Sequence, residues 1–190
     1  MVTTDKTIGQ PFIFLLSCML LISIAICLYA CAYHGKADIP ENVHLIENVH
    51  FFDQDDNQCG PSTLAGVLNF YGVHVLPEEI ADEIFSKNVR GTMTFDMLFY
   101  AQKKGLYARQ YRGNIENLQE NILKNHPLIV LVNFGNSLFQ VNHFMVVKGY
   151  SDTGFIVQSG NNKNKHISFG KFLDIWNSTE NWTLLIKKAK

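Results

Sequence analysis

Cys59 is the residue in this sequence whose type and position are best suited to chemistry. It lies in the stretch DQDDNQCGPSTLAGVLNFYG (53–72), where a polar run gives way to a helical pattern opened by Gly60-Pro61. The aligned peptide dipoles of a helix place roughly half a positive charge at its first residues, which lowers the pKa of a thiol there. The pattern therefore predicts a nucleophilic thiolate, with a small buried hydrophobe as the alternative.

His143 supplies the second group that such chemistry requires. It begins the apolar run HFMVVKGY (143–150), so a strand would present its imidazole at the edge of a sheet. An imidazole facing the thiol can take its proton and later give that proton to a leaving amine. The alternative is a histidine whose ring is satisfied by neighbouring strand backbone.

Gln54 is a candidate for stabilising the negative oxygen that forms when a thiolate attacks a carbonyl. It lies shortly before the cysteine, and its side-chain amide can donate to that oxygen together with the backbone N–H of Cys59. Gln58, directly before the cysteine, is the competing candidate.

Helical patterns come first along the chain, and strand patterns follow. Turn residues and apolar spacing predict four helices that begin near Gly60, Pro77, Thr94 and Ile115, and a later one from Ser168 to Trp176. Short runs rich in β-branched residues predict strands at 128–134, 143–150, 155–159 and 182–188. We therefore expect an α+β fold in which a cysteine-bearing helix precedes an antiparallel sheet.

An apolar segment without charge runs from Phe12 to Tyr33. As a helix it is long enough to cross about 30 Å of hydrocarbon, as a membrane anchor does. Leu28-Tyr29-Ala30-Cys31 resembles the cleavage box of bacterial lipoproteins, so lipidation of Cys31 is an equal alternative. We expect an anchor or lipoprotein signal over 1–34, a linker over 35–48 and a folded domain over 49–190, held outside the cytoplasm in the bacterial periplasm or cell envelope.

Composition narrows the classes of partner. The sequence is 47% hydrophobic, its formal net charge is -1 and its basic residues are dispersed, which gives no argument for binding nucleic acid. Cys18, Cys27 and Cys31 lie in the apolar segment, so Cys59 has no disulfide partner in the folded domain. The histidines show no HxxxH, HExxH or CxxC pairing, so we expect neither a metal nor another cofactor.

Together these residues resemble the motifs of a known family. Gln54-x4-Cys59-Gly60-Pro61, a helix ending at Tyr71-Gly72, and the run from His143 to Tyr150 are similar to the bacteriocin-processing, double-glycine-leader cysteine peptidases of the papain-like superfamily. The likeness is closest to free-standing, exported members without a transporter, and the chain has no GxxxxGK[ST] loop. The resemblance implies a papain-like fold, with an N-terminal helical lobe and a C-terminal antiparallel sheet lobe. It also implies that Cys59 is the nucleophile, His143 the general base and acid, and Gln54 part of the oxyanion hole.

One position departs from the family pattern. The family usually places an aspartate after the strand that follows the histidine, to orient the imidazole, whereas this chain reads Val157-Gln158-Ser159-Gly160-Asn161. Ser159 lies nearest the expected position, and Gln158 or Asn161 could accept the imidazole N–H instead. A neutral acceptor stabilises an imidazolium less than a carboxylate does, so we expect slow turnover or a narrow substrate range.

The sequence therefore predicts a membrane-tethered cysteine peptidase that hydrolyses peptide bonds of a peptide or protein, with an export system or transporter as a candidate partner. Two alternatives use the same residues. One is a catalytically weak or inactive domain that binds leader peptides for an export system. The other is a papain-like amidase that acts on cell-wall peptides.

Overall fold

The computed structural model of the chain describes residues 42–53, 58–88, 90–136 and 138–189, together with Met19 and Ile22. The chain divides into two units, Met1–Ile39 and Pro40–Lys190, and the fold described below is that of the second unit. Apart from these two residues, the expected membrane anchor lies outside the described residues, and so does Cys31. Within the described ranges, no helix combines the length and the apolar character that a membrane crossing needs.

An antiparallel sheet of seven strands forms the centre of the second unit. Its strands follow the order β4-β9-β5-β6-β7-β8, and β1 pairs with β6. The strands are β1 His44–Leu45, β4 Leu106–Arg112, β5 Leu128–Asn133, β6 Asn142–Tyr150, β7 Gly154–Ser159, β8 Asn162–Ser168 and β9 Trp182–Lys188. Because β6 and β7 each have partners on both sides, the two strands that carry His143 and Ser159 are held firmly within the sheet.

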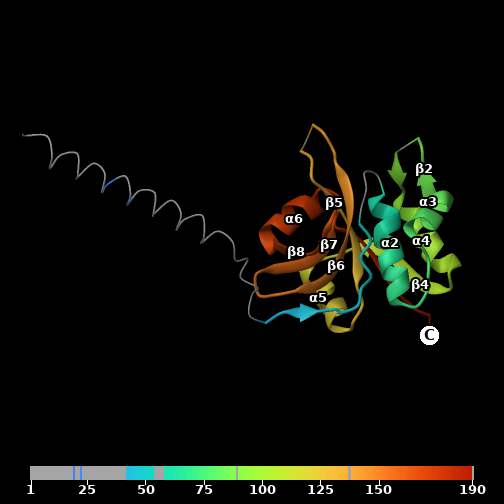
Figure 1. Ribbon diagram of the computed structural model, residues 1–190, viewed down its shortest axis with the longest axis horizontal. Helices are drawn as coiled ribbons and strands as arrows, with labels where there is room; N and C mark the ends of the chain where they lie inside the picture. The colour runs from blue at the N-terminus through green and yellow to red at the C-terminus, as the bar shows by residue number, and fades with distance from the viewer. Residues whose placement is uncertain are drawn as a thin grey trace, which may run out of the picture. The chain divides into compact units, whose positions relative to one another are not determined.

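Helices α2, α3 and α4 lie on one side of the sheet, and α6 lies on the other (Figure 1). The strands β2 and β3 pair as a small hairpin between α3 and α4. These elements are α2 Cys59–Phe70, α3 Pro77–Ile84, β2 Phe85–Ser86, β3 Gly91–Thr92, α4 Thr94–Lys103, α5 Ile115–Leu123 and α6 Phe169–Asn177. The helical part and the sheet thus meet along α2, which contacts β6.

The helix α2 is buried along most of its length. Every residue of Gly60–Leu68 is buried, unlike the residues of an amphipathic surface helix. The segment that precedes the helix in the chain also packs against it, since a Cβ placed on Gly66 would lie 2.6 Å from the backbone oxygen of His50. Glycine is required for that approach. This close packing holds the middle of α2, the helix that begins at Cys59, against the segment before it.

Aromatic side chains hold α6 against the sheet. The ring of Phe155 in β7 lies 4.7 Å from that of Phe172, measured between centroids, and Phe172 lies 5.1 Å from Trp176. All three side chains are fully buried, and each removes on the order of 150–250 Å² from water. Trp176 also donates from Nε1 to the backbone oxygen of Trp182, at 3.1 Å. The packing stabilises β7, whose last residue is Ser159.

The predicted α+β fold, with a helical lobe before an antiparallel sheet, is confirmed. Helix α5 begins where the sequence predicts, because the Asn114 side chain accepts a hydrogen bond from the backbone N–H of Asn117 at 2.8 Å. The two-residue strands β1, β2 and β3 were not predicted, and neither were the longer strands β4 and β8. Strands β4 and β8 lie at the two ends of the main strand order, and β8 reads NKNKHIS. Edge strands bury less side-chain surface, so their apolar signal is weak.

Candidate active site

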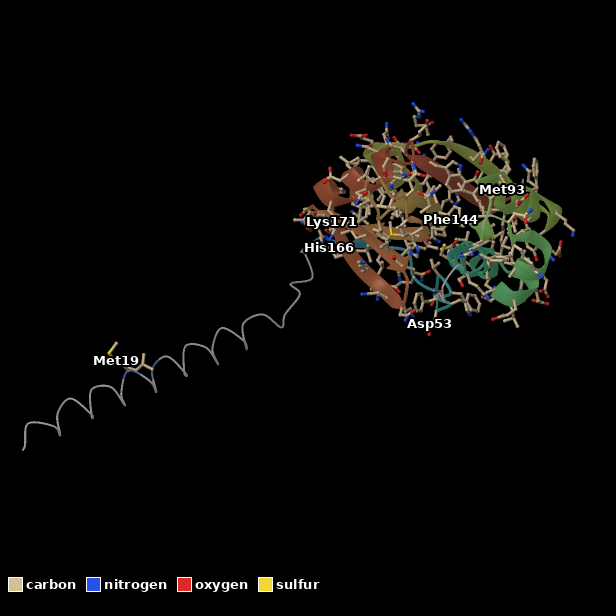
Figure 2. The ribbon with its side chains drawn as sticks, turned by 90° about the horizontal axis from the view of Figure 1, so that it is seen from above. Met19, Asp53, Met93, Phe144, His166 and Lys171 are labelled. Carbon is tan, nitrogen blue, oxygen red and sulfur yellow. The ribbon has the colours of Figure 1, made fainter. Side chains whose placement is uncertain are left out.

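Cys59 is the first residue of α2 and lies where this helix meets the sheet. The preceding residue, Gln58, makes no side-chain capping hydrogen bond. Gly60 allows β3 to approach, since a Cβ there would lie 2.8 Å from the Cβ of Thr92. The sulfur is half-buried, and the backbone N–H of Phe144 in β6 is close enough to act on it. Phe144 lies between the strands and the helical part in the second view (Figure 2).

Burial raises the pKa of the Cys59 thiol above its usual value. Hydrogen bonds from the backbone at Phe144, Gly60 and Cys59 itself favour the thiolate, but their effect on the pKa is smaller than that of burial. The low pKa expected at a helix N-terminus is therefore not found in the resting protein. Removal of the sulfur from water disfavours its charged form more than the backbone N–H groups favour it.

His143 is the second residue of β6, and Ser159 holds its ring. The distance from His143 Nε2 to Ser159 Oγ is 3.1 Å. Ser159 ends the neighbouring strand, so the pairing of β6 with β7 brings the two side chains together. The ring of Phe134 lies 5.4 Å from the imidazole between centroids. Because Nε2 is engaged, Nδ1 is the ring nitrogen that remains for proton exchange.

Burial, and then the positive charge of Lys165, lower the pKa of His143 to about 4. The imidazole is therefore neutral at pH 7, and with the protonated thiol it forms a neutral pair. Among the described residues no hydrogen bond joins the sulfur of Cys59 to this ring, although Cys59 interacts with the residue that follows His143. Catalytic hydrogen bonds are often loose until substrate binds.

Gln158 and Asn161, the alternatives to Ser159, do not contact the imidazole. The buried Gln158 side chain donates to the backbone oxygen of Val49 at 3.0 Å. Gln158 is therefore engaged with the segment before α2, whereas Ser159 is hydrogen-bonded to the ring. Asn161 is exposed in the turn between β7 and β8. Of the three candidates, the structure brings only Ser159 to His143.

The two oxyanion-hole candidates differ in whether the structure describes them, and His143 has two neighbours that the sequence did not predict. Gln54 lies outside the described residues, whereas its competitor Gln58 is described and is half-buried directly before α2. Phe134 and Lys165 lie near His143, and sequence reasoning missed both. The sequence holds no signal for Lys165, because the polar run NKNKHIS carries no strand pattern that would place it beside β7.

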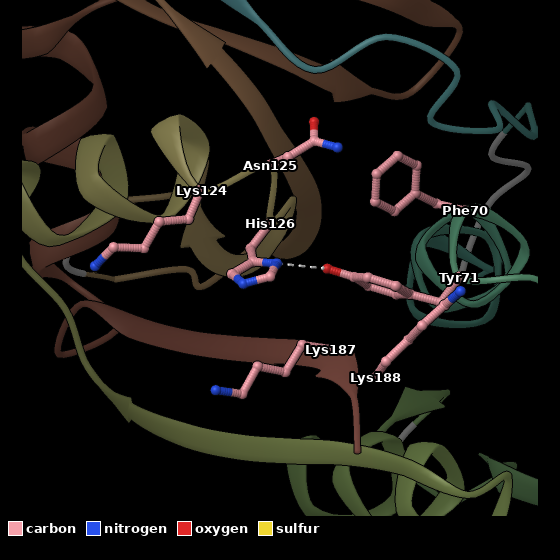
Figure 3. A pocket seen from close by; sticks show the side chains of 7 residues that line it. All are labelled: Phe70, Tyr71, Lys124, Asn125, His126, Lys187 and Lys188. Atoms are coloured by element: carbon pink, nitrogen blue, oxygen red, sulfur yellow. Dashed lines mark hydrogen bonds between the residues drawn. The ribbon is translucent and has the colours of Figure 1, made fainter. Parts of the chain in front are cut away.

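A cavity of about 480 Å³ lies at the opposite end of α2. Its lining consists of Phe70, Tyr71, Lys124, Asn125, His126, Lys187 and Lys188 (Figure 3). The Tyr71 hydroxyl lies 3.1 Å from His126 Nδ1. Both α2 and α5 end here, and the partial negative charge of helix C-termini favours nearby lysines. The lining has no thiol, so the candidate nucleophile lies at the other end of the helix.

The sequence pattern of the Peptidase_C39 like family matches residues 46–183, a range that includes Cys59, His143 and Ser159. The chain therefore belongs to the Peptidase_C39 like family.

Two curated relatives are similar over part of the chain. An uncharacterized protein of Methanothermobacter marburgensis is 34% identical over 94 residues, which are 50% of this chain and 58% of that protein. An uncharacterized protein of Methanothermobacter thermautotrophicus is 34% identical over 89 residues, which are 47% of this chain and 55% of that protein. The matches thus span little more than half the length of these relatives.

Solved structures show the same fold. A Bacillus anthracis protein described as a C39-like peptidase has a TM-score of 0.63 and 18% identity, over 79% of this chain and 100% of that one. A double glycine motif protease from an AMS/PCAT transporter, solved in complex with the leader peptide, has a TM-score of 0.60 and 23% identity, over 80% and 96%. The peptidase domain of Streptococcus ComA, a bifunctional ABC transporter of a quorum-sensing pathway, has a TM-score of 0.59 and 19% identity, over 75% and 100%. At these identities the likeness shows the fold of C39-like peptidase domains.

Proposed function

We propose that the chain is a cysteine peptidase that hydrolyses a peptide bond of a peptide or protein. The sulfur of Cys59 attacks the carbonyl carbon, Nδ1 of His143 takes the thiol proton and gives it to the leaving amine, and water then releases the acyl group from sulfur. Ser159 accepts a hydrogen bond from Nε2–H and so leaves Nδ1 free. The backbone N–H of Cys59 and the side-chain amide of Gln54 donate to the developing oxyanion.

The observation that carries this proposal is a half-buried thiol at the start of α2, next to the backbone of Phe144, together with the half-buried His143 that precedes Phe144 and whose Nε2 is bonded to Ser159. A neutral resting pair suits a route in which the imidazole accepts the proton as the sulfur attacks. A thiolate formed in this way exists only during the reaction, and the positive end of α2 stabilises its negative charge at that stage. An imidazole with a pKa of about 4 and an uncharged orienting residue make a weak base, which is consistent with slow turnover.

The substrate class and the location of the domain are part of the same proposal. Because one structural neighbour was solved with a leader peptide and another is a transporter domain, we propose a leader-like peptide as the substrate, supplied by an export system. The apolar segment Phe12–Tyr33 would act as an anchor, or Cys31 would carry a lipid, with the catalytic domain outside the cytoplasm.

A docking domain without catalysis is the second candidate. The raised thiol pKa and the neutral Ser159 in place of a carboxylate both favour it over a fast enzyme. A cell-wall amidase would use the same thiol and imidazole on a different substrate.

Turnover by the full chain tests these functions. The substrates are a leader-like peptide set and purified peptidoglycan fragments, and the matched variants are Cys59→Ala and Cys59→Ser. We expect cleavage of the peptides by the native protein alone, with an acyl adduct on Cys59 detected by mass spectrometry. Turnover of peptidoglycan alone would identify the amidase, whereas leader binding without cleavage would identify the docking domain. Equal cleavage by the native protein and Cys59→Ala would reject the thiol mechanism.

A further inference from the structure

Lys165 brings a positive charge close to the proposed active site. Its Nζ lies 5.7 Å from the centroid of the Phe134 ring, and that ring lies 5.4 Å from the ring of His143. Lys165 is in β8, opposite Val157 of β7, and β7 ends at the serine that holds the imidazole. Phe134 therefore lies near both groups, and the charge of Lys165 acts on the imidazole from the edge strand β8.

This ammonium group has no acidic partner in the part of the chain that the structure describes. The ion pairs there join Lys103 to Glu83, Arg112 to Glu180, and Lys124 to Glu120. The strands β6, β7 and β8 contain no aspartate or glutamate, although they carry Lys148, Lys163 and Lys165. Within the described ranges, the strands around His143 thus supply no acid to offset the charge of Lys165.

Few ionisable groups act on His143 within the described ranges. The charged group that acts on its pKa is Lys165 of β8, whereas the neighbours from β7 and from the segment after β5 are the neutral Ser159 and Phe134. Lys165 is half-buried against the ring of Phe134, so it is less hydrated than a lysine extended into water. Charges interact more strongly where water is partly excluded.

We propose that Lys165 binds a carboxylate of the substrate next to the scissile bond, an inference that rests on the peptidase function proposed above. The carboxylate belongs either to an acidic side chain flanking the bond or to the free C-terminus of a short peptide, since both present the same pair of oxygens. A bound carboxylate also offsets the positive charge that acts on His143. The imidazole is then a stronger base when such a substrate is in place.

The test compares three peptides that share one cleavage site, using the full chain. The first has glutamate beside the scissile bond and an amidated C-terminus, the second has glutamine there and the same amide, and the third has glutamine and a free C-terminal carboxylate close to the bond. We expect kcat/KM for the first or the third to exceed that for the second about tenfold, as a charge-assisted hydrogen bond allows. The peptide whose kcat/KM is raised identifies the source of the carboxylate.

Variants at two lysines of one strand show whether Lys165 causes this preference. Lys165→Met keeps an apolar stem on Phe134 and should reduce the ratio of acid to amide to about one, while Lys165→Glu should invert it. Lys163→Met removes an equal charge from the same strand and should leave the ratio unchanged. A preference that survives Lys165→Met, or that Lys163→Met removes equally, overturns the inference.

The inference and the peptidase function fail in different ways. Cleavage that depends on Cys59 but is equal for all three peptides rejects the carboxylate site and leaves the peptidase in place. If Cys59→Ala cleaves as fast as the native protein, the peptidase proposal is rejected. Peptide binding to Cys59→Ala then tests the carboxylate site on its own. In Cys59→Ala, a carboxylate peptide should move the NMR titration of His143 to higher pH, and the glutamine amide should not. No such movement, or an equal one in Cys59→Ala/Lys165→Met, overturns the inference.

Discussion

Each end of α2 lies near a histidine whose pKa is lowered, but the two ends differ in the charged groups around them. At its start, Cys59 lies next to the backbone of Phe144, the residue after the half-buried His143, and at its end the Tyr71 hydroxyl lies 3.1 Å from His126. Burial lowers the pKa of both histidines, to about 4 for His143. The end of the helix has the open cavity and three lysines, whereas its start has the thiol and a neutral serine.

Helix polarity explains why chemistry is expected at the start of α2. The start of α2 carries partial positive charge, which stabilises a thiolate or an oxyanion as either develops. The other end carries partial negative charge, which the lysines of the cavity offset, so that an attacking anion gains nothing there from the helix.

Among changes at the two ends of α2, removing the Cys59 thiol should have the largest effect on kcat/KM. Cys59→Ala is expected to lower kcat/KM for a cleaved peptide by roughly a thousandfold or more, because the nucleophile is lost. Urea unfolding should show that the variant remains folded. The matched change at the other end, Tyr71→Phe, should leave kcat/KM within about twofold. A comparable loss in Tyr71→Phe would mean that both ends of the helix serve catalysis.

The second largest effect is expected in the pH dependence of Cys59 alkylation, which reports how the start of α2 affects the thiol. A thiol whose pKa is raised above 9.0 carries very little thiolate at pH 6, so reaction of Cys59 with iodoacetamide should be several hundredfold slower at about pH 6 than at about pH 9. The measurement needs a background in which Cys18, Cys27 and Cys31 are serine, with Cys59→Ala as the blank. Rapid labelling at pH 6 would show that the helix dipole outweighs burial.

The serine that holds the imidazole should have a smaller effect. Ser159→Ala removes the partner of His143 Nε2 and is expected to lower kcat about tenfold, because the ring loses its orientation. Ser159→Asp adds a negative charge that favours the imidazolium, so the pKa of His143 rises from about 4. The acid limb of the kcat/KM profile should therefore move to higher pH. An unmoved acid limb in Ser159→Asp would remove Ser159 from the mechanism.

The smallest effect is expected at the cavity. Tyr71→Phe removes the hydrogen bond to His126 and should lower the free energy of unfolding by about 1 kcal/mol, measured by urea denaturation. His126→Ala in the Tyr71→Phe background closes a double-mutant cycle that isolates this one contact. A coupling energy near zero would show that the bond does not stabilise the end of α2.

Local signals were enough to predict most elements of this domain. Gly72 and Gly105 lie just beyond helices and have φ values of 88° and 82°, which is the left-handed conformation that glycine adopts readily. The predicted capping by Asn114 is observed, and apolar runs mark β5, β6, β7 and β9. The polar strand β8 was missed, because only its neighbour in the sheet makes NKNKHIS a strand.

The sequence by itself determined the order of the elements and the identity of Cys59 and His143 as candidates, since capping residues, glycine turns and apolar periodicity are local properties. Only the tertiary structure decided which of Gln158, Ser159 and Asn161 meets the imidazole, because strand register and pleat set the direction of each side chain. It also decided the protonation of the pair and the presence of Lys165 beside it. Burial and charge depend on residues far apart in the chain, which no local pattern records.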